Sequence, residues 1–173
     1  MKIRKATQTD RESIFQLYQR VACTTIGLIR SADEITKEYI ADFIQKSIDT
    51  GIGLVAEDQN GKLIAEIHTY PMGIRAFDHI LANLTCVVHP DEQGKGIGKQ
   101  IFQNLLEEIK RHHPDIGRVE LIARESNTKA ITLYEKLGFK KEGRLEKRIR
   151  HSTNSFEADI MMAWFNPNYK FNC

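Results

Sequence analysis

The sequence has few cysteines and no long apolar run. Cys23, Cys86 and Cys173 are odd in number and far apart, and neither Cys-x-x-Cys nor His-x-x-x-His spacing accompanies them. This pattern argues against a disulfide framework and against a zinc site, so we expect no metal and a reducing compartment. No segment approaches about 20 apolar residues, and no apolar stretch follows the basic start at residues 2–5. We therefore expect a cytoplasmic protein without a membrane span.

A dominant charge of one sign is also absent. The chain has 25 basic and 23 acidic residues, for a formal net charge of +2. This balance gives no field strong enough to indicate nucleic acid or an anionic membrane as a partner. With 173 residues the chain can bury a core without disulfides or metal, and we predict a single domain over residues 1–173.

The hydrophobic periodicity predicts alternating strands and helices. Helices are expected near residues 10–21, 35–50, 97–113 and 127–137, and an Asn60-Gly61 pair indicates a hairpin between two of the strands. The expected strands are Lys2–Ala6, Ile52–Asp58, Lys62–Tyr70, Ile80–Val88, Val119–Ala123, Lys140–Arg148 and Phe156–Phe165. The order βααβββαβαββ predicts an α/β protein with a mixed sheet and helices on both faces.

A glycine-rich segment joins the strand ending at Val88 to the helix that begins near Ile97. Gly94, Gly96 and Gly98 stand at alternate positions. Glycine permits left-handed backbone angles and lets successive N–H groups converge on an anion. The N-terminus of the helix adds unpaired amides and the positive end of its dipole. The segment is therefore predicted to bind phosphate.

Two familiar phosphate loops do not fit this segment. A Walker loop requires Ser or Thr after the Gly-Lys pair, but Gln100 follows Gly98-Lys99. The dinucleotide fingerprint requires glycine where Lys99 stands. A nucleotide-dependent enzyme is kept only as a third hypothesis, which predicts that ATP or NAD stabilises the protein.

Two segments instead resemble the GNAT superfamily of N-acetyltransferases. Residues 93–98, Gln-Gly-Lys-Gly-Ile-Gly, follow Val88-His89-Pro90, and residues 127–139 match Asn-x-x-Ala-x-x-Leu-Tyr-x-x-x-Gly-Phe. The resemblance implies a twisted, mostly antiparallel sheet of about seven strands with about four helices. It also implies acetyl-CoA as acyl donor and an amine as acceptor.

The resemblance further implies which residues hold the cofactor. Amides from Gln93 to Lys99 are expected to bind the pyrophosphate of coenzyme A, and a backbone N–H of the preceding strand is expected to polarise the thioester carbonyl. The cofactor-binding residues so identified are Cys86, Val87, Val88, Gln93, Gly94, Lys95, Gly96, Ile97, Gly98, Lys99, Asn127 and Ala130. We interpret Cys86 as a small buried side chain rather than a nucleophile, because the sequence places no activating cation or base beside it.

Tyr134 is the predicted general acid. It lies seven residues after Asn127, two turns along the same helical face, so its phenol could reach a sulfur bound near Asn127. A phenol of pKa about 10 can protonate or hydrogen-bond a departing thiolate of pKa near 8.5. The alternative is that Tyr134 is a core side chain, because it belongs to an apolar stripe.

The sequence leaves the base that deprotonates the amine open. Some GNAT members carry a glutamate in the strand before the phosphate loop, whereas this chain has Leu-Ala-Asn-Leu at residues 81–84. Glu66 and His68 share one face of a predicted strand with Tyr70, and that face could instead be merely solvated or hydrogen-bonded. The candidates for the base are Glu66, His68, His79 and water.

Together these features predict an N-acetyltransferase in which an amine attacks acetyl-CoA directly within a ternary complex. The acceptor, a small-molecule or a protein amine, has no recognisable code in residues 22–33, 72–79 or 151–155. The basic residues at 140–150 are interpreted as a solvated face. A non-catalytic acyl-CoA sensor or interaction module is the main alternative, and a homodimer stays open.

Overall fold

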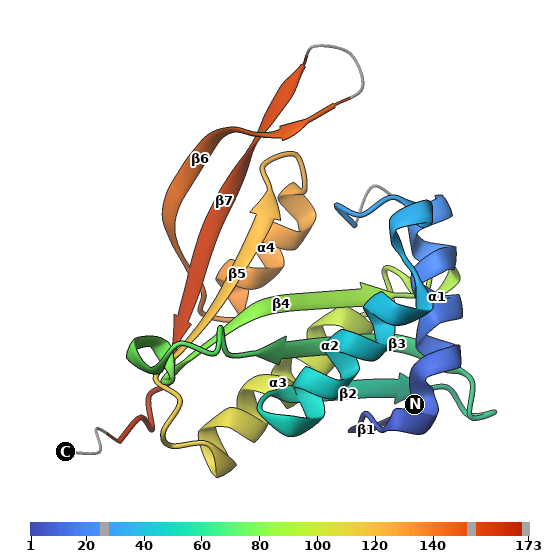
Figure 1. The fold of residues 1–173 in the computed structure, drawn as a ribbon, viewed down its shortest axis with the longest axis horizontal. Coiled ribbons are helices and arrows are strands. Elements are labelled where there is room, and N and C mark those ends of the chain that lie inside the picture. Colours follow the sequence, from blue (N-terminus) through green and yellow to red (C-terminus); the bar gives the residue numbers. More distant parts are fainter. Residues whose placement is uncertain (25–27, 152–154, 171–173) are drawn as a thin grey trace.

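The computed structural model describes residues 1–24, 28–151 and 155–170 (Figure 1). The strands are β1 (Lys2–Lys5), β2 (Ile52–Glu57), β3 (Leu63–Tyr70), β4 (Ile80–Val88), β5 (Arg118–Arg124), β6 (Lys140–Arg150) and β7 (Phe156–Phe165). The helices are α1 (Arg11–Thr24), α2 (Lys37–Asp49), α3 (Ile97–His112) and α4 (Thr128–Lys136). The predicted order βααβββαβαββ is confirmed.

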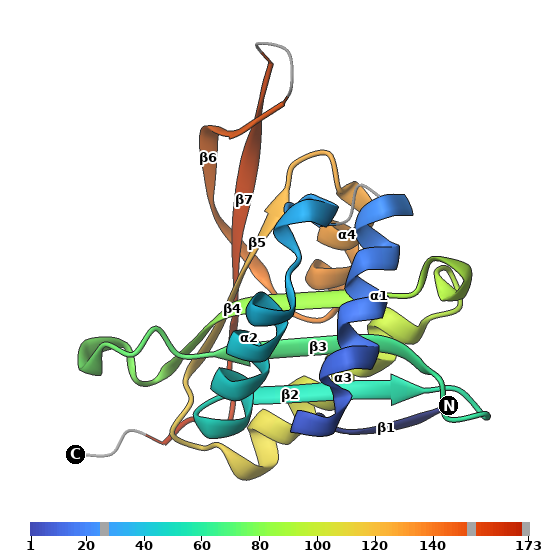
Figure 2. The same cartoon turned by 45° about the vertical axis from the view of Figure 1, so that its right-hand side comes forward.

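The strands form one sheet in the order β1-β2-β3-β4-β5-β7-β6. Neighbouring strands are antiparallel except for β4 and β5, which are parallel. Helices α1 and α2 cover one face and α3 covers the other (Figures 1 and 2). The mixed, mostly antiparallel sheet with helices on both faces is therefore confirmed.

Strand β7 lies between β5 and β6, a position that the order of the elements along the chain does not reveal. The predicted hairpin of β6 and β7 is present, and His151 N donates to Ser155 O at 2.9 Å across its end. The hairpin extends beyond the other strands (Figure 2). Its turn at residues 152–154 lies outside the described residues.

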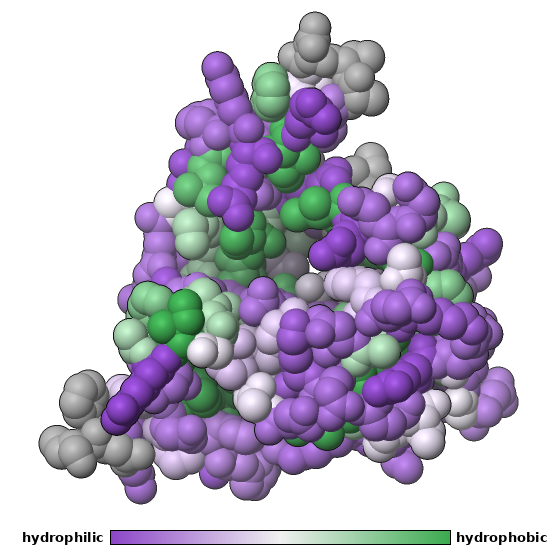
Figure 3. Space-filling view, in the orientation of Figure 1, coloured by the Kyte–Doolittle hydropathy of each residue, from purple (hydrophilic) through white to green (hydrophobic). Residues whose placement is uncertain are grey.

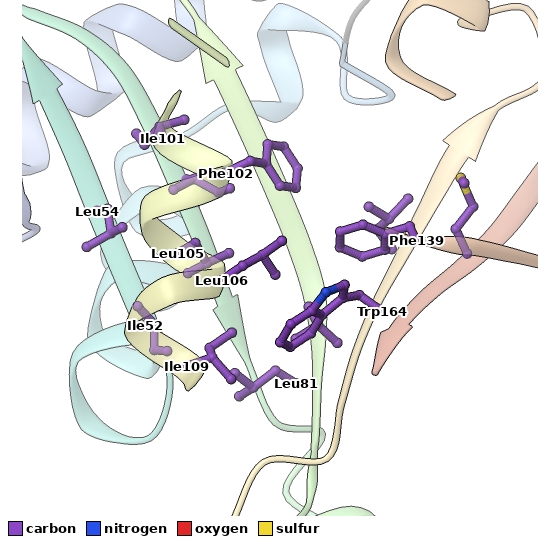
Figure 4. Close-up of a cluster of buried hydrophobic side chains, with 14 of the residues drawn as sticks. Ile52, Leu54, Leu81, Ile101, Phe102, Leu105, Leu106, Ile109, Phe139 and Trp164 are labelled. Carbon is purple, nitrogen blue, oxygen red and sulfur yellow. The ribbon is translucent and has the colours of Figure 1, made fainter. Parts of the chain in front are cut away.

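The core has one apolar layer on each face of the sheet. The stripe of α3 packs toward β2 and β4 and toward Phe139 and Trp164 (Figure 4). Its fully or nearly fully buried members are Ile97, Ile101, Phe102, Leu105, Leu106 and Ile109. The burial of each such side chain contributes about 1.5–3 kcal/mol, so the stripe fixes α3, and with it the glycine loop, against the sheet.

Strands β4 and β5 pair over a short distance and then separate. Their parallel register covers only Ile80 opposite Arg118 and Leu81 opposite Val119. The β3–β4 register then shifts by one residue, and Asn83 has φ 54, a left-handed angle that asparagine tolerates. Such a bulge bends a strand. The carboxyl-terminal parts of β4 and β5 are left on either side of a gap, where the site lies.

Candidate functional site

A cavity of about 380 Å³ opens beside the glycine loop, and we call it the loop cavity. It is lined by Val21, Leu28, Cys86, Val87, Val88, Glu92, Gln93, Gly94, Gly96, Ile97, Gly98, Lys99, Phe102, Asn127, Lys129, Ala130, Leu133 and Tyr134. Every sequence-predicted site residue except Lys95 belongs to this lining. The Lys95 ammonium instead lies 3.1 Å from the Glu92 carboxylate.

The glycine loop presents free backbone amides to the loop cavity. Gly94 and Gly96 have φ values of 78° and 82°, and a Cβ at either position would meet no atom within 4 Å. The N–H groups of residues 94–99 find no acceptor in the part of the chain that the structure describes. Gln93 Nε2 donates to Val88 O at 3.2 Å and ties the loop to β4. Free amides, open space and the N-terminus of α3 together form an anion cradle.

Two lysines add positive charge to this cradle. Lys99 follows the loop in the first turn of α3, and Lys129 stands in the first turn of α4. Both line the loop cavity, where Glu92 is the lining carboxylate. Lys129 was not predicted from the sequence, because its contribution depends on how α4 packs beside the loop.

The carboxyl-terminal half of β4 is open on the side that faces the gap. After Leu81 no strand among the described residues pairs with β4 on that side. Cys86, Val87 and Val88 line the loop cavity there. An unpaired strand edge offers N–H and C=O groups to an extended ligand, so β4 can bind such a chain as an added strand would bind.

Asn127 and Ala130 form the opposite wall. Asn127 Oδ1 accepts from the Ala130 backbone N–H at 3.3 Å and so caps the start of α4. Asn127 also lines the loop cavity. The cap therefore fixes the side chain at the start of α4, close to the open edge of β4.

Tyr134 lies where its phenol is shielded from water. Its ring packs against Phe102 and Phe139, with centroid distances of 5.2 and 6.0 Å. Burial raises the pKa of the Tyr134 phenol well above its usual value, and the neighbouring Cys86 adds to the rise. The phenol is therefore protonated at neutral pH and can donate a proton. Tyr134 lines the cavity and also packs on the core, and its role as general acid stays a prediction.

Cys86 is chemically quiet. Burial, with a smaller effect from the Glu66 carboxylate, raises the pKa of its thiol well above the usual value. A thiol in this state is a poor nucleophile. Cys86 is half-buried, and its raised thiol pKa favours the interpretation that it is not a nucleophile.

A second cavity, of about 180 Å³, lies in the gap between β4 and β5, and we call it the gap cavity. Figure 3 shows a hollow between the hairpin strands and the helical part of the molecule, with apolar atoms on its walls. The gap cavity is lined by Tyr18, Leu28, Ile29, Arg30, Ile35, Tyr39, Leu84, Thr85, Cys86, Ile122, Ala123, Arg124, Asn127 and Tyr134. Leu28, Cys86, Asn127 and Tyr134 line both cavities, so the two cavities meet at these residues.

A buried polar cluster adjoins the gap cavity. Tyr18 Oη donates to Glu66 Oε2 at 2.7 Å, and His68 Nδ1 lies 3.0 Å from Glu66 Oε1. The three residues are at most 2% exposed, and the His68 ring stacks on Phe43 with centroids 3.9 Å apart. The face that carries Glu66 and His68 is therefore buried and hydrogen-bonded, not solvated.

Tyr18 connects this cluster to the gap cavity, and its role was missed in the sequence. It stands in the buried apolar stripe of α1, with Ile14, Leu17 and Val21. Burial, together with the nearby Glu66 carboxylate, raises the pKa of Tyr18 well above its usual value. The signal that could have identified it is the hydroxyl itself, because a buried tyrosine usually has a hydrogen-bond partner.

His79 is not brought to either cavity. Its Nδ1 lies 3.9 Å from the exposed Asp78 carboxylate, and its ring is 6.3 Å from that of Tyr169. Neither cavity includes His79 in its lining. Glu66 and His68 do not line these cavities either, but both contact Tyr18, which lines the gap cavity.

Two further properties concern the described residues as a whole. None of their helices has both the length and the apolar character needed to cross a membrane. They also contain no group of three or more His, Cys, Asp or Glu side chains arranged to hold a metal ion.

Sequence comparisons agree with the glycine loop and the α4 segment. A profile of the acetyltransferase (GNAT) domain family matches residues 49–141, more than half of the chain. The [ribosomal protein bS18]-alanine N-acetyltransferase of Escherichia coli K12 is 33% identical over 105 residues, covering 61% of this chain and 66% of that protein. The UPF0157 protein YqkA of Bacillus subtilis is 37% identical over 83 residues, covering 48% of this chain. The match spans only 22% of YqkA.

A solved structure extends the likeness to the whole fold. YncA of Salmonella typhimurium, solved with its cofactor acetyl-CoA, superposes with a TM-score of 0.85 at 18% identity. The superposition covers 100% of this chain and 98% of YncA. At this identity the likeness establishes the fold.

Proposed function

The chain belongs to the GNAT acetyltransferase family, and from this premise we propose that it transfers the acetyl group of acetyl-CoA to a primary amine. The amine attacks directly within a ternary complex. The observation that carries the proposal is the loop cavity, where unpaired amides of residues 94–99 adjoin the open edge of β4 and the protonated Tyr134 phenol. The chemistry that acetyl-CoA supplies is an activated acetyl group on a thioester.

The loop cavity fits such a donor. The amides of residues 94–99, with Lys99 and Lys129, would hold the diphosphate. The backbone of Cys86 to Val88 would hold the extended arm and place an N–H against the thioester carbonyl, where negative charge develops. Asn127 and Ala130 would contact the same arm from α4.

Tyr134 would protonate the departing sulfur. Its phenol is protonated at neutral pH because burial raises its pKa. As the C–S bond breaks, the phenol proton passes to the sulfur and leaves free coenzyme A thiol. The direct-attack mechanism needs no acyl-enzyme, and the raised pKa of Cys86 disfavours one at that thiol.

Glu66, acting through Tyr18, would receive the proton of the attacking amine. Tyr18 lines the gap cavity and donates to Glu66 at 2.7 Å. When the amine gives its proton to the Tyr18 oxygen, Tyr18 passes its own proton to Glu66 and stays neutral, which agrees with its raised pKa. His68 contacts the other Glu66 oxygen and acts as a positioning residue.

An acceptor screen that measures free thiol tests the function. The protein is mixed with acetyl-CoA and a panel of primary amines that includes amino acids, polyamines, aminoglycosides and peptides. Thiol release with at least one amine, together with the acetylated product by mass spectrometry, is the expected result. Stabilisation by coenzyme A without thiol release for any amine would contradict the enzyme and favour the acyl-CoA sensor. Stronger stabilisation by ATP or NAD would contradict both.

A further inference from the structure

The gap cavity is positively charged. Its charged lining side chains are Arg30 and Arg124, and no acidic side chain lines it among the described residues. Apolar walls such as Leu84 and Ile122 lower the local dielectric and strengthen the field of the two guanidinium groups. The cavity therefore favours a ligand with a negative group.

Arg124 has an unused donor. Its Nη2 donates to Leu28 O at 3.3 Å. Its Nε is buried and has no hydrogen-bond partner in the described part of the chain. A buried donor without a partner is costly, and a carboxylate that entered the cavity would satisfy it.

Two carboxylates lie near Arg124, and its positive charge favours the ionised form of both. Asp159 stands opposite Arg124 in the β5–β7 register, with its Oδ2 3.2 Å from Arg148 Nε, while its Oδ1 has no hydrogen-bond partner in the described part of the chain. Glu157 accepts from the Ser126 backbone N–H at 2.7 Å and lies 3.1 Å from His151 Nε2. Arg124 thus retains bonding capacity for a ligand.

Arg30 is held beside the same cavity by an aromatic ring. Its guanidinium carbon lies 4.3 Å from the centroid of Tyr39. Stacking of this kind orients the plane of the guanidinium, and a side-chain hydrogen bond between Arg30 and Tyr39 also holds it. The two arginines come from different segments, Arg30 from the segment after α1 and Arg124 from the end of β5.

The rest of the cavity limits the size and character of the ligand. A volume of about 180 Å³ holds roughly six water molecules at about 30 Å³ each. The apolar wall consists of Leu28, Ile29, Ile35, Leu84 and Ile122. This space suits a small molecule with an apolar side chain.

We propose that the acceptor is a small α-amino acid with an apolar side chain. Its carboxylate binds Arg124 and Arg30, its side chain lies on the apolar wall, and its amine reaches the junction of the two cavities beside Tyr134. The proposal rests on the proposed function, since it names the acceptor of the same site. Two positive charges would repel a polyamine or an aminoglycoside.

The test compares amino acids with their amides, which differ only in the carboxylate, and adds two polycationic amines. Initial rates of thiol release are measured for apolar L-amino acids, from alanine to methionine, for the matching amino acid amides, and for spermidine and kanamycin. Wild-type protein is expected to show a kcat/KM at least tenfold higher for the best amino acid than for its amide. Arg124→Gln should lose at least tenfold on the amino acid, change little on the amide, and keep its KM for acetyl-CoA.

Two further variants separate this role from a structural one. Arg30→Gln changes an exposed segment and should reduce the same preference without disturbing β5. Arg144→Gln, which removes an arginine paired with Glu125 outside both cavities, should leave the preference intact. Equal loss on acid and amide in both cavity variants, or a wild-type preference for amides, spermidine or kanamycin, would overturn the acceptor class. Absence of thiol release with every acceptor would overturn the proposed function itself.

Discussion

The loop cavity and the gap cavity meet at four residues but are built in different ways. The loop cavity takes most of its donors from the backbone of one continuous stretch, residues 86–99, and adds the start of α4. The gap cavity takes side chains from α1, the segment after it, α2, β4 and β5. Backbone N–H donors suit the diphosphate of the cofactor, which is the same in every reaction, whereas side chains can distinguish one acceptor from another. On the proposed function, acetyl-CoA binding depends on residues close together in the sequence, and the choice of acceptor depends on residues that only the tertiary structure brings together.

Removal of the Tyr134 hydroxyl should have the largest effect, because that group stands where both cavities meet. Tyr134→Phe is expected to lower kcat about 100- to 10,000-fold, as loss of a general acid does, with KM for acetyl-CoA nearly unchanged. Steady-state rates and coenzyme A thermal shifts measure the two effects. Phe139→Leu, which loosens the same packing but keeps the phenol, is the control. Unchanged turnover in Tyr134→Phe would remove the general-acid role.

Loss of the proton path from the amine through Tyr18 to Glu66 should affect turnover at the gap cavity and leave acetyl-CoA binding in the loop cavity unchanged. Tyr18→Phe and Glu66→Gln are expected to lower kcat about 100-fold at pH 7. The deficit should shrink toward pH 9.5, because an amine of pKa about 10 then loses its proton without help. The control Tyr39→Phe alters another tyrosine of this cavity that has no bond to Glu66. A deficit that is constant with pH would indicate a structural role only.

A substitution in the glycine loop should weaken acetyl-CoA binding in the loop cavity and leave the gap cavity unchanged. Gly96→Ala places a side chain at φ 82°, which lowers the free energy of unfolding by about 1–2 kcal/mol. The added Cβ would also hold the diphosphate away from the loop amides, so KM for acetyl-CoA should rise about 5- to 30-fold. Gly61→Ala imposes the same strain at φ 79° in the β2–β3 turn, away from both cavities. Both variants should lose stability, and only Gly96→Ala should lose affinity for coenzyme A by calorimetry. Equal affinities of Gly96→Ala and Gly61→Ala for coenzyme A would contradict the proposed anion cradle.

Substitution of Cys86 should give the smallest effect on turnover, although Cys86 lines both cavities. Its thiol has a raised pKa and no assigned chemistry, so Cys86→Ala should change kcat by no more than about threefold, or roughly 0.6 kcal/mol. Mass spectrometry after a turnover mixture is quenched should find no acetylated Cys86 in the wild type. An acyl-enzyme, or a large loss of kcat, would contradict direct attack.

The sequence predicted the boundaries of helices and strands best where one hydrophobic pattern was strong. The residues of β4 are those expected, and α3 begins at Ile97 and ends at His112, before Pro114 as expected, because its apolar repeat and the flanking glycines and proline agree. The insertion of β7 between β5 and β6 was not predicted. Strand order depends on which faces are buried together, and the periodicity of a single strand carries no information on its neighbours.

The sequence by itself determined the family, the element order and the backbone half of the site, because glycine spacing and helix starts act on adjacent residues. Only the tertiary structure decided that Tyr18 joins Glu66 and His68, that Arg30 and Arg124 face one cavity, and that His79 stands apart. These side chains come from segments up to about a hundred positions distant along the chain. Folding brings them together through the burial of the α1 and α2 stripes on the sheet and through the early separation of β4 from β5, and no local pattern encodes either event.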